Sequence, residues 1–199
     1  PTPISGQGLN RCPNMTYYMA DQIQNRHDPT ALQAAALDVM SCASIPDLPT
    51  AQRMAEAAAA QEMNLGDHET RVTMIVLKDA VRRMAAMPGQ RSIIVISPGF
   101  ITLAEHSSDK TEIMDRAIRA NILINALDAR GLYTDSPDIT RGGTNPQTTQ
   151  VLNQMDRETA RAQSDVLAEL AAGTGATFYQ NSNDLDEGFA RLAAAPEFY

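Results

Sequence analysis

The sequence has little of the chemistry that nucleic-acid-binding and membrane-spanning proteins need. Lysine and arginine total 16 against 24 aspartates and glutamates, so the formal net charge is −8 over 199 residues. An acidic chain lacks the cationic surface that releases counterions from nucleic acid, and its charge disfavours an anionic membrane surface. No apolar run approaches the ~20 residues of a transmembrane helix, and the first residues do not have the pattern of a signal peptide. We therefore expect neither a nucleic-acid partner nor membrane insertion.

Cysteine is scarce, and the familiar motifs of catalytic and metal-binding proteins are absent. The sequence has no Cys-x-x-Cys, no His-Glu-x-x-His, no phosphate-binding Gly-rich loop ending in Gly-Lys-Ser/Thr and no Gly-x-Ser-x-Gly. Its two cysteines, Cys12 and Cys42, are too few for a metal site, which leaves a free buried pair or a disulfide. Apolar spacing predicts helices over residues 15–26 and 30–43, and a hairpin of these helices would bring the two sulfurs together. This favours the disulfide.

The residues that are abundant predict a helical first half. Hydrophobic residues make up 43% and charged residues 20%, which is typical of a globular chain. Asp28 followed by Pro29 is a good helix start. The pattern over residues 51–87 is helical, with Gly66 as an expected break and Asp67 or Thr70 as a new start. The apolar face expected in its second part consists of Val72, Ile75, Val76, Ala80, Met84 and Met87.

The second half alternates between strand and helix. Ile93, Ile94, Val95 and Ile96 form an unbroken aliphatic run, which is typical of a strand buried in a parallel sheet. Further strands are predicted at 122–127 and 176–179, with helices at 110–121 and 149–172, a last helix after Asp184 and a long loop over 131–147. This alternation predicts an α/β layer of parallel strands that neighbour one another in chain order. Right-handed crossovers put the helices of 110–121 and 149–172 on one face, and we expect residues 72–87 and the last helix on the other.

Four segments together resemble a known family. They are the stretches Arg-Ser-Ile-Ile-Val-Ile-Ser-Pro-Gly-Phe at 91–100, Ala-Leu-Asp-Ala-Arg-Gly-Leu at 126–132, 167–175 and 181–192. In this order they resemble the bacterial VWFA-related domain of the acidobacterial type, a divergent branch of the von Willebrand factor A fold. The resemblance covers residues 67–199 and implies a three-layer, Rossmann-like parallel sheet. Residues 1–66 then form a helical N-terminal appendage, similar to an insertion found in part of the group.

The sequence shows fewer strands than this fold has. Because three strands are few for so much helix, we expect either that the chain is a piece of a longer protein whose first strands lie before Pro1, or that its helical first half takes the place of those strands. The strand of Ile93 to Ile96 would then be an open edge, and open edges pair with other chains. We therefore expect self-association through this edge, unless another segment covers it.

The resemblance also implies a magnesium site, from which this sequence departs. The family places Asp-x-Ser-x-Ser after its first strand, a threonine in a middle loop and an aspartate after the strand that is 93–96 here. The sequence has no Asp-x-Ser-x-Ser, and Pro98 stands where the last aspartate belongs. Thr70 stands either at the threonine position or as a helix cap. We expect no cofactor, with Mg²⁺ binding only if residues before Pro1 complete the site.

Four predicted ligand-binding residues lie at the carboxyl ends of two strands, where open α/β sheets bind ligands: Ser97, Gly99, Asp128 and Arg130. The fifth, Thr70, precedes the strands and is included because the resemblance implies a threonine from a middle loop. Three of the four strand-end residues have structural alternatives. The Ser97 hydroxyl is either a nucleophile with His106 as its base or a turn hydroxyl that binds backbone. Asp128 and Arg130 either bind a ligand or pair with each other.

These observations predict a non-catalytic protein-interaction module in an extracytoplasmic, periplasmic or secreted, bacterial protein. Its partner is an unidentified protein, and its metal site is degenerate or incomplete. One alternative is a hydrolase-like enzyme that uses Ser97, Asp128 and His106. Another is a purely structural domain that positions its neighbours.

Overall fold

The computed structural model describes residues 12–132 and 146–194. The predicted lead-in at 1–11 and the predicted loop at 133–145 lie outside the described residues. In the part that is described, no helix combines the length and the apolar character that crossing a membrane requires.

The described residues divide into two compact units. The first unit contains residues 12–67 and 146–159, and the second contains 68–132 and 160–194. Two long helices, α3 (Leu48–Ala85) and α5 (Pro146–Gly173), contribute residues to both units.

The first unit is helical and alanine-rich. It contains α1 (Tyr17–Gln24), α2 (Pro29–Cys42) and the first part of α3. The Asp28 carboxylate accepts hydrogen bonds from the backbone N–H groups of the first turn of α2, so the predicted helix start at Asp28 is confirmed. The core includes fully buried alanines of α3 that let this helix approach its neighbours closely: Ala51, Ala55 and Ala59.

The first unit also carries the predicted disulfide. Cys12 and Cys42 are bonded to each other, with their Cα atoms 5.7 Å apart. The bond closes a loop of 30 residues and ties the end of α2 to the residues before α1.

Helix α3 is uninterrupted, which corrects the expected break at Gly66. A Cβ atom on Gly66 would lie 2.3 Å from Cγ of Tyr17, so glycine here gives space to the Tyr17 ring. Thr70 lies in the middle of the helix, so it does not cap a second one. A single glycine costs an α-helix about 1 kcal/mol, which the packing around the ring offsets.

The second unit is built on a small parallel sheet. Its strands are β1 (Arg91–Ser97), β2 (Ile122–Asp128) and β3 (Phe178–Tyr179), in the spatial order β1-β2-β3. The predicted parallel order is therefore confirmed, and the chain is a mixed α/β protein. Strand β3 is shorter than predicted because the N–H group of Thr177 bonds to the side chain of Asn125 instead of to a backbone carbonyl of β2.

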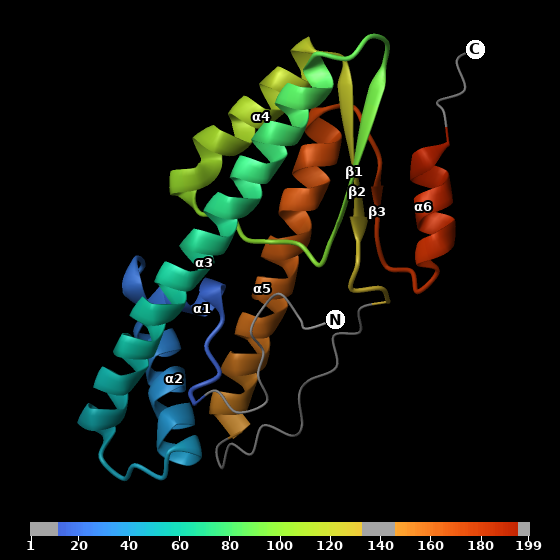
Figure 1. Cartoon of the computed structure of the whole chain (residues 1–199). Helices are drawn as coiled ribbons and strands as arrows, with labels where there is room; N and C mark the ends of the chain where they lie inside the picture. The colour runs from blue at the N-terminus through green and yellow to red at the C-terminus, as the bar shows by residue number, and fades with distance from the viewer. Residues whose placement is uncertain (1–11, 133–145, 195–199) are drawn as a thin grey trace. The chain divides into compact units, whose positions relative to one another are not determined.

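Three helices cover one face of this sheet. They are α3, α4 (Ser107–Arg119) and α5, whose apolar side chains form one buried cluster with β2. Helix α6 (Leu185–Ala193) lies on the other side of the sheet (Figure 1). The cluster is formed by Met74, Leu77, Val81, Ile113, Ala117, Ile122, Ile124, Ala126, Val166, Leu167, Leu170 and Ala171.

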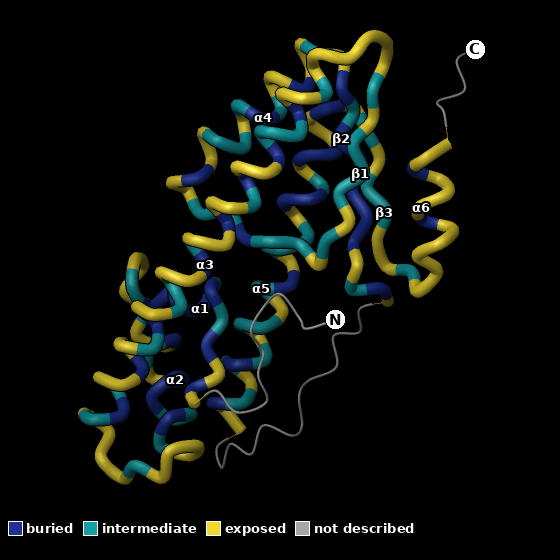
Figure 2. The backbone as a smooth tube through the Cα atoms, in the orientation of Figure 1, coloured by how far each residue is buried: buried dark blue, intermediate teal, exposed yellow. Residues whose placement is uncertain are grey.

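The position of α3 corrects two expectations. It shares the face of α4 and α5, whereas residues 72–87 were expected opposite them. The crossover rule fixes the side of a helix that joins two parallel strands, and α3 only precedes the first strand. Its buried stripe also differs from the expected one. Val72, Ile75, Val76 and Met87 are 46–61% exposed, and Figure 2 shows the alternation of buried and exposed residues along the chain.

Candidate functional site

The carboxyl ends of β1 and β2 bring two predicted site residues side by side. Ser97 and Asp128 are register partners at the ends of the two strands. The Ser97 carbonyl accepts a hydrogen bond of 2.9 Å from the N–H group of Ala129. The Ser97 hydroxyl accepts a hydrogen bond of 3.1 Å from the N–H group of Gly99. Ser97 therefore stabilises the turn that leaves β1.

Asp128 is neutralised by its neighbour Arg130. The Asp128 residue is 4% exposed and the Arg130 side chain 16%. The Arg130 Nε atom lies 2.9 Å from Oδ1 of Asp128, and Nη2 lies 2.5 Å from Oδ2. The backbone N–H of Arg130 also donates to Oδ1. Such a bidentate, charge-assisted pair fixes both side chains and leaves the carboxylate little capacity for a substrate.

The same arginine joins the strand end to the helix layer. Its Nη1 atom donates a hydrogen bond of 2.8 Å to the carbonyl of Ala160 in α5. Asp128, through Arg130, thus holds the end of β2 against α5.

Gly99 is required by a close approach of two backbones. Its φ of +89° lies in the left-handed region, and a Cβ atom there would be 2.3 Å from the carbonyl oxygen of Gln163. The loop after β1 therefore packs directly on α5. No other residue type fits this position without a shift of the backbone.

Thr70 contacts the same loop from helix α3. It is 2% exposed, and its hydroxyl donates a hydrogen bond of 2.9 Å to the carbonyl of Ile101. The expectation that Thr70 is a helix cap is wrong. Its hydroxyl anchors the loop after β1 to α3. It also gives the buried Ile101 carbonyl a hydrogen-bond partner, and a buried carbonyl without one is costly.

These residues do not fit a magnesium ion. Mg²⁺ needs an octahedral set of oxygen ligands. Pro98 supplies no side-chain oxygen, and the Asp128 carboxylate is held by the guanidinium of Arg130, whose positive charge repels a cation. The Thr70 hydroxyl is already bonded to Ile101.

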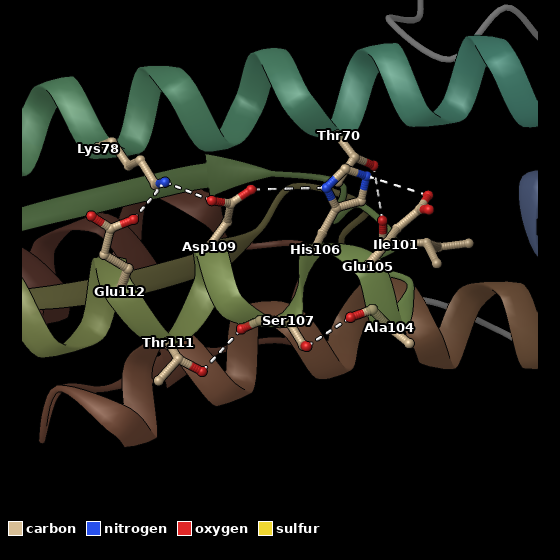
Figure 3. Close-up of polar contacts among 10 residues, drawn as sticks. All are labelled: Thr70, Lys78, Ile101, Ala104, Glu105, His106, Ser107, Asp109, Thr111 and Glu112. Carbon is tan, nitrogen blue, oxygen red and sulfur yellow. Dashed lines mark hydrogen bonds and ion pairs between the residues drawn. The ribbon is translucent and has the colours of Figure 1, made fainter.

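His106 lies in a charged cluster at the start of α4 (Figure 3). It ends a short 3-10 helix, η1 (Ala104–His106), and its side chain is 6% exposed. Its Nε2 atom lies 3.8 Å from a Glu105 oxygen, and Nδ1 lies 4.0 Å from Oδ2 of Asp109. Both distances are too long for hydrogen bonds.

Lys78 connects this cluster to α3. Its Nζ atom lies 2.6 Å from Oδ1 of Asp109 and 2.7 Å from Oε2 of Glu112. The hydrogen bond from Lys78 is the main reason that the pKa of Asp109 is lowered, and it also lowers the pKa of Glu112. The two carboxylates in turn raise the pKa of Lys78. The network is a charged clamp between α3 and α4.

The residues of the hydrolase alternative have separate sets of contacts. Ser97 bonds to Gly99, Asp128 to Arg130, and the imidazole of His106 faces the carboxylates of Glu105 and Asp109. Sequence reasoning named all three but missed the Lys78 clamp. Lys78 and Asp109 are 31 residues apart, so only the fold brings them together.

The loops after β2 and β3 complete this edge of the sheet. The Asn183 side chain accepts a hydrogen bond of 2.7 Å from the N–H group of Leu132. The side chain of Leu132 remains exposed, with 57% of the residue accessible to solvent, and Pro98 is exposed after β1. At this edge, the apolar residues Leu132 and Pro98 are therefore exposed to solvent, whereas the polar residues Asp128 and Thr70 are buried.

Comparison with known proteins adds no relative from which a function can be transferred. Neither a family model, nor a curated protein, nor a solved structure matches the chain.

Proposed function

We propose that the chain is a non-catalytic binding module of von Willebrand A type, which recognises a protein partner at the carboxyl ends of its strands. The observation that carries this proposal is the adjacency of Ser97 and Asp128 at the ends of two parallel strands. In open α/β sheets, ligands bind at this edge. Three parallel strands in chain order, with helices on both faces, agree with the arrangement that the motifs imply.

The chemistry of the edge supports binding better than catalysis. The Asp128 carboxylate is neutralised by Arg130, and the Ser97 hydroxyl accepts a backbone hydrogen bond. A nucleophile needs a base within hydrogen-bond reach, whereas the imidazole of His106 faces the carboxylates of Glu105 and Asp109. An exposed apolar side chain such as Leu132 is suited to contact with another protein.

The proposed location is outside the cytoplasm. The Cys12–Cys42 disulfide supports this, since such bonds persist in oxidising compartments and are rare in the cytosol.

Two variants with exposed, similarly apolar target residues test the proposed binding edge. Leu132 follows β2 and is 57% exposed, whereas Met87 precedes β1 at the other end of the strands and is 52% exposed. Wild type, Leu132→Arg and Met87→Arg would serve as baits for an extracytoplasmic protein extract. We expect a partner that wild type and Met87→Arg retain, that Leu132→Arg loses, and that a metal chelator does not release.

Other outcomes count against the proposal. Equal capture by all three baits would place the binding surface elsewhere. Release by the chelator would contradict a degenerate metal site, and hydrolysis of an ester or peptide that Ser97→Ala abolishes would support the enzyme instead.

A further inference from the structure

Strand β1 is an edge of the sheet with unusual composition. Its seven residues pair with β2 on one side, and no other strand of the described residues pairs with it. Natural edge strands are protected by charges, prolines or bulges. The stretch Ser-Ile-Ile-Val-Ile at 92–96 has no charge and no proline.

The backbone groups of three residues point away from β2. The N–H group of Arg91 donates to Asn121, and the carbonyl of Ser97 accepts from Ala129, so these two residues face β2. Orientation alternates along a strand. The N–H and C=O groups of Ser92, Ile94 and Ile96 therefore face the free edge, with Ile94 at their centre.

Helix α3 forms the outer border of the helix layer on this same side. In Figure 3, α4 lies between α3 and α5. Ion pairs agree with this order, because Lys78 of α3 contacts Asp109 of α4, and Lys110 of α4 contacts Glu169 of α5. Since α4 crosses from β1 to β2, α3 lies beyond β1.

The flank of α3 that faces away from α4 carries an apolar centre between opposite charges. Val76 and Ala80 are each two residues from Lys78, which turns them about 200° from it, away from α4. Residues at successive spacings of three and four from these two lie on the same flank: Glu69, Val72 and Arg83. Val76 is 61% exposed, and Glu69 and Arg83 are exposed at either end.

This flank is complementary to itself. Glu69 and Arg83 are each seven residues from Val76, on opposite sides. Within one chain, Arg83 pairs with Asp79, one turn before it, at 2.5 Å. If two copies of α3 lie antiparallel with their Val76 side chains facing each other, Glu69 of each copy lies opposite Arg83 of the other and joins this ion pair.

The edge strand has the same centre of symmetry. Arg91 is tied to the end of α3 by a hydrogen bond of 3.1 Å to the carbonyl of Met84. Ile94 lies three residues, or about 10 Å, along β1 from there. Val76 lies eight residues, about 12 Å, back along α3 from Met84. One two-fold axis can therefore pass close to both Ile94 of the strand and Val76 of the helix.

We propose that this surface binds a second copy of the chain and forms a symmetric dimer with a continuous sheet. The two β1 strands pair antiparallel, so that each Ile94 exchanges both backbone hydrogen bonds with Ile94 of the second copy, and Ser92 does so with Ile96. The two α3 helices pack side by side above them. This inference does not depend on the proposed function, since it uses a different edge of the sheet.

Two adjacent residues provide a matched test. Ile75 is 59% exposed and Val76 61%, but Ile75 is turned about 100° from Val76 towards the α4 side. Sedimentation equilibrium of the whole disulfide-bonded chain would measure dimerisation, with circular dichroism as a check of folding. Val76→Glu places two carboxylates on the axis, so we expect it to raise the dimer dissociation constant about 100-fold. Ile75→Glu should leave that constant within about twofold.

A charge exchange tests the register. Glu69→Arg places like charges opposite each other and should weaken the dimer about tenfold. Adding Arg83→Glu to the same chain should restore most of the affinity. The proposal is overturned if the wild type stays monomeric at about 1 mM, if Val76→Glu and Ile75→Glu act alike, if the double exchange fails to restore binding, or if a different protein occupies this edge in place of the second copy.

Discussion

Arg130 holds the carboxylate of Asp128 through two side-chain nitrogens, Nε at 2.9 Å from Oδ1 and Nη2 at 2.5 Å from Oδ2, where both side chains are largely buried. This pair ends β2 and connects it to α5 through the carbonyl of Ala160. It also leaves the carboxylate beside Ser97 with little capacity to bind a ligand. The contacts of Asp128 therefore give it a structural role at the end of β2.

Replacing Arg130 should be strongly destabilising. Arg130→Met leaves the buried Asp128 charge without its partner, and such a loss costs about 3–5 kcal/mol of the free energy of unfolding. Urea denaturation followed by circular dichroism measures the effect. Arg119→Met is the control, because Arg119 is 82% exposed and its ion pair is 3.8 Å long, so we expect a change within about 0.5 kcal/mol. Similar losses in both variants would show that the Asp128 pair has no special structural role.

Alanine substitutions at Gly99 and Gly89 should distinguish the effect of a positive φ on the free energy of unfolding from the effect of a close contact. Both have a positive φ, +89° and +83°, but only Gly99 has an atom within reach of a Cβ, the Gln163 oxygen at 2.3 Å. Gly89→Ala should cost the left-handed penalty of about 1–2 kcal/mol. Gly99→Ala should cost about 2 kcal/mol more in the same denaturation experiment, because the loop must move off α5. Equal costs would mean that the loop shifts freely.

The Lys78 clamp should give stability a defined pH dependence. Hydrogen bonds from Lys78 lower the pKa of Asp109 and Glu112 from their usual 3.8 and 4.5, and the carboxylates raise the pKa of Lys78 above 10.5. The carboxylate contribution is complete above the unfolded values and is lost as pH falls through the lowered ones. The lysine contribution is complete below 10.5 and is lost as pH rises through the raised value.

The stability difference between wild type and Lys78→Met should therefore be flat between about pH 5 and 10 and shrink on both sides. Denaturation midpoints across this range measure it. A difference that stays constant down to pH 2 would show that Lys78 acts through packing of its aliphatic stem and not through charge.

Magnesium should bind this chain only very weakly. Pro98 replaces an oxygen ligand, and Arg130 occupies the Asp128 carboxylate. Calorimetric titration of the whole chain should give a dissociation constant above about 1 mM, because too few free oxygens converge to replace the hydration shell of the ion. A micromolar constant would contradict this prediction, and its loss in Asp128→Asn would then place the ion at the strand ends.

The sequence was sufficient for the sheet and insufficient for the helix that borders it. The run of Ile93 to Ile96 predicts a parallel strand through its β-branched composition, and chain order predicts its neighbours. The expected burial of this strand is wrong: β1 lies at an end of the strand order, none of its residues is buried, and Ile96 is 56% exposed. Helix α3, however, has two apolar stripes. Periodicity selects the one with Val72 and Val76, whereas the fold buries the one with Met74 and Leu77.

Sequence patterns could not predict the long-range polar contacts either. The hydrogen bond from Thr70 to Ile101 and the ion pair of Lys78 with Asp109 each span 31 residues. Periodicity reports only neighbours along one element. Gly66 is a third case, since the space that it provides is for the ring of Tyr17, far away in the sequence.

The disulfide should stabilise the helical first unit by an amount that reduction can measure. Cys12 and Cys42 close a loop of 30 residues, for which the chain-entropy relation gives roughly 3.5 kcal/mol. The core of this unit consists largely of alanine, which contributes helix propensity but little apolar volume. A covalent tie should therefore account for much of the resistance of this unit to local unfolding.

We expect reductant to lower the thermal midpoint of the helical circular dichroism signal of the wild type and to leave that of the double variant Cys12→Ser/Cys42→Ser unchanged. Thiol counting under denaturing, non-reducing conditions should find no free thiol in the native protein. Two free thiols, or a melt that reductant does not move, would contradict the prediction and remove the support that the disulfide gives to an extracytoplasmic location.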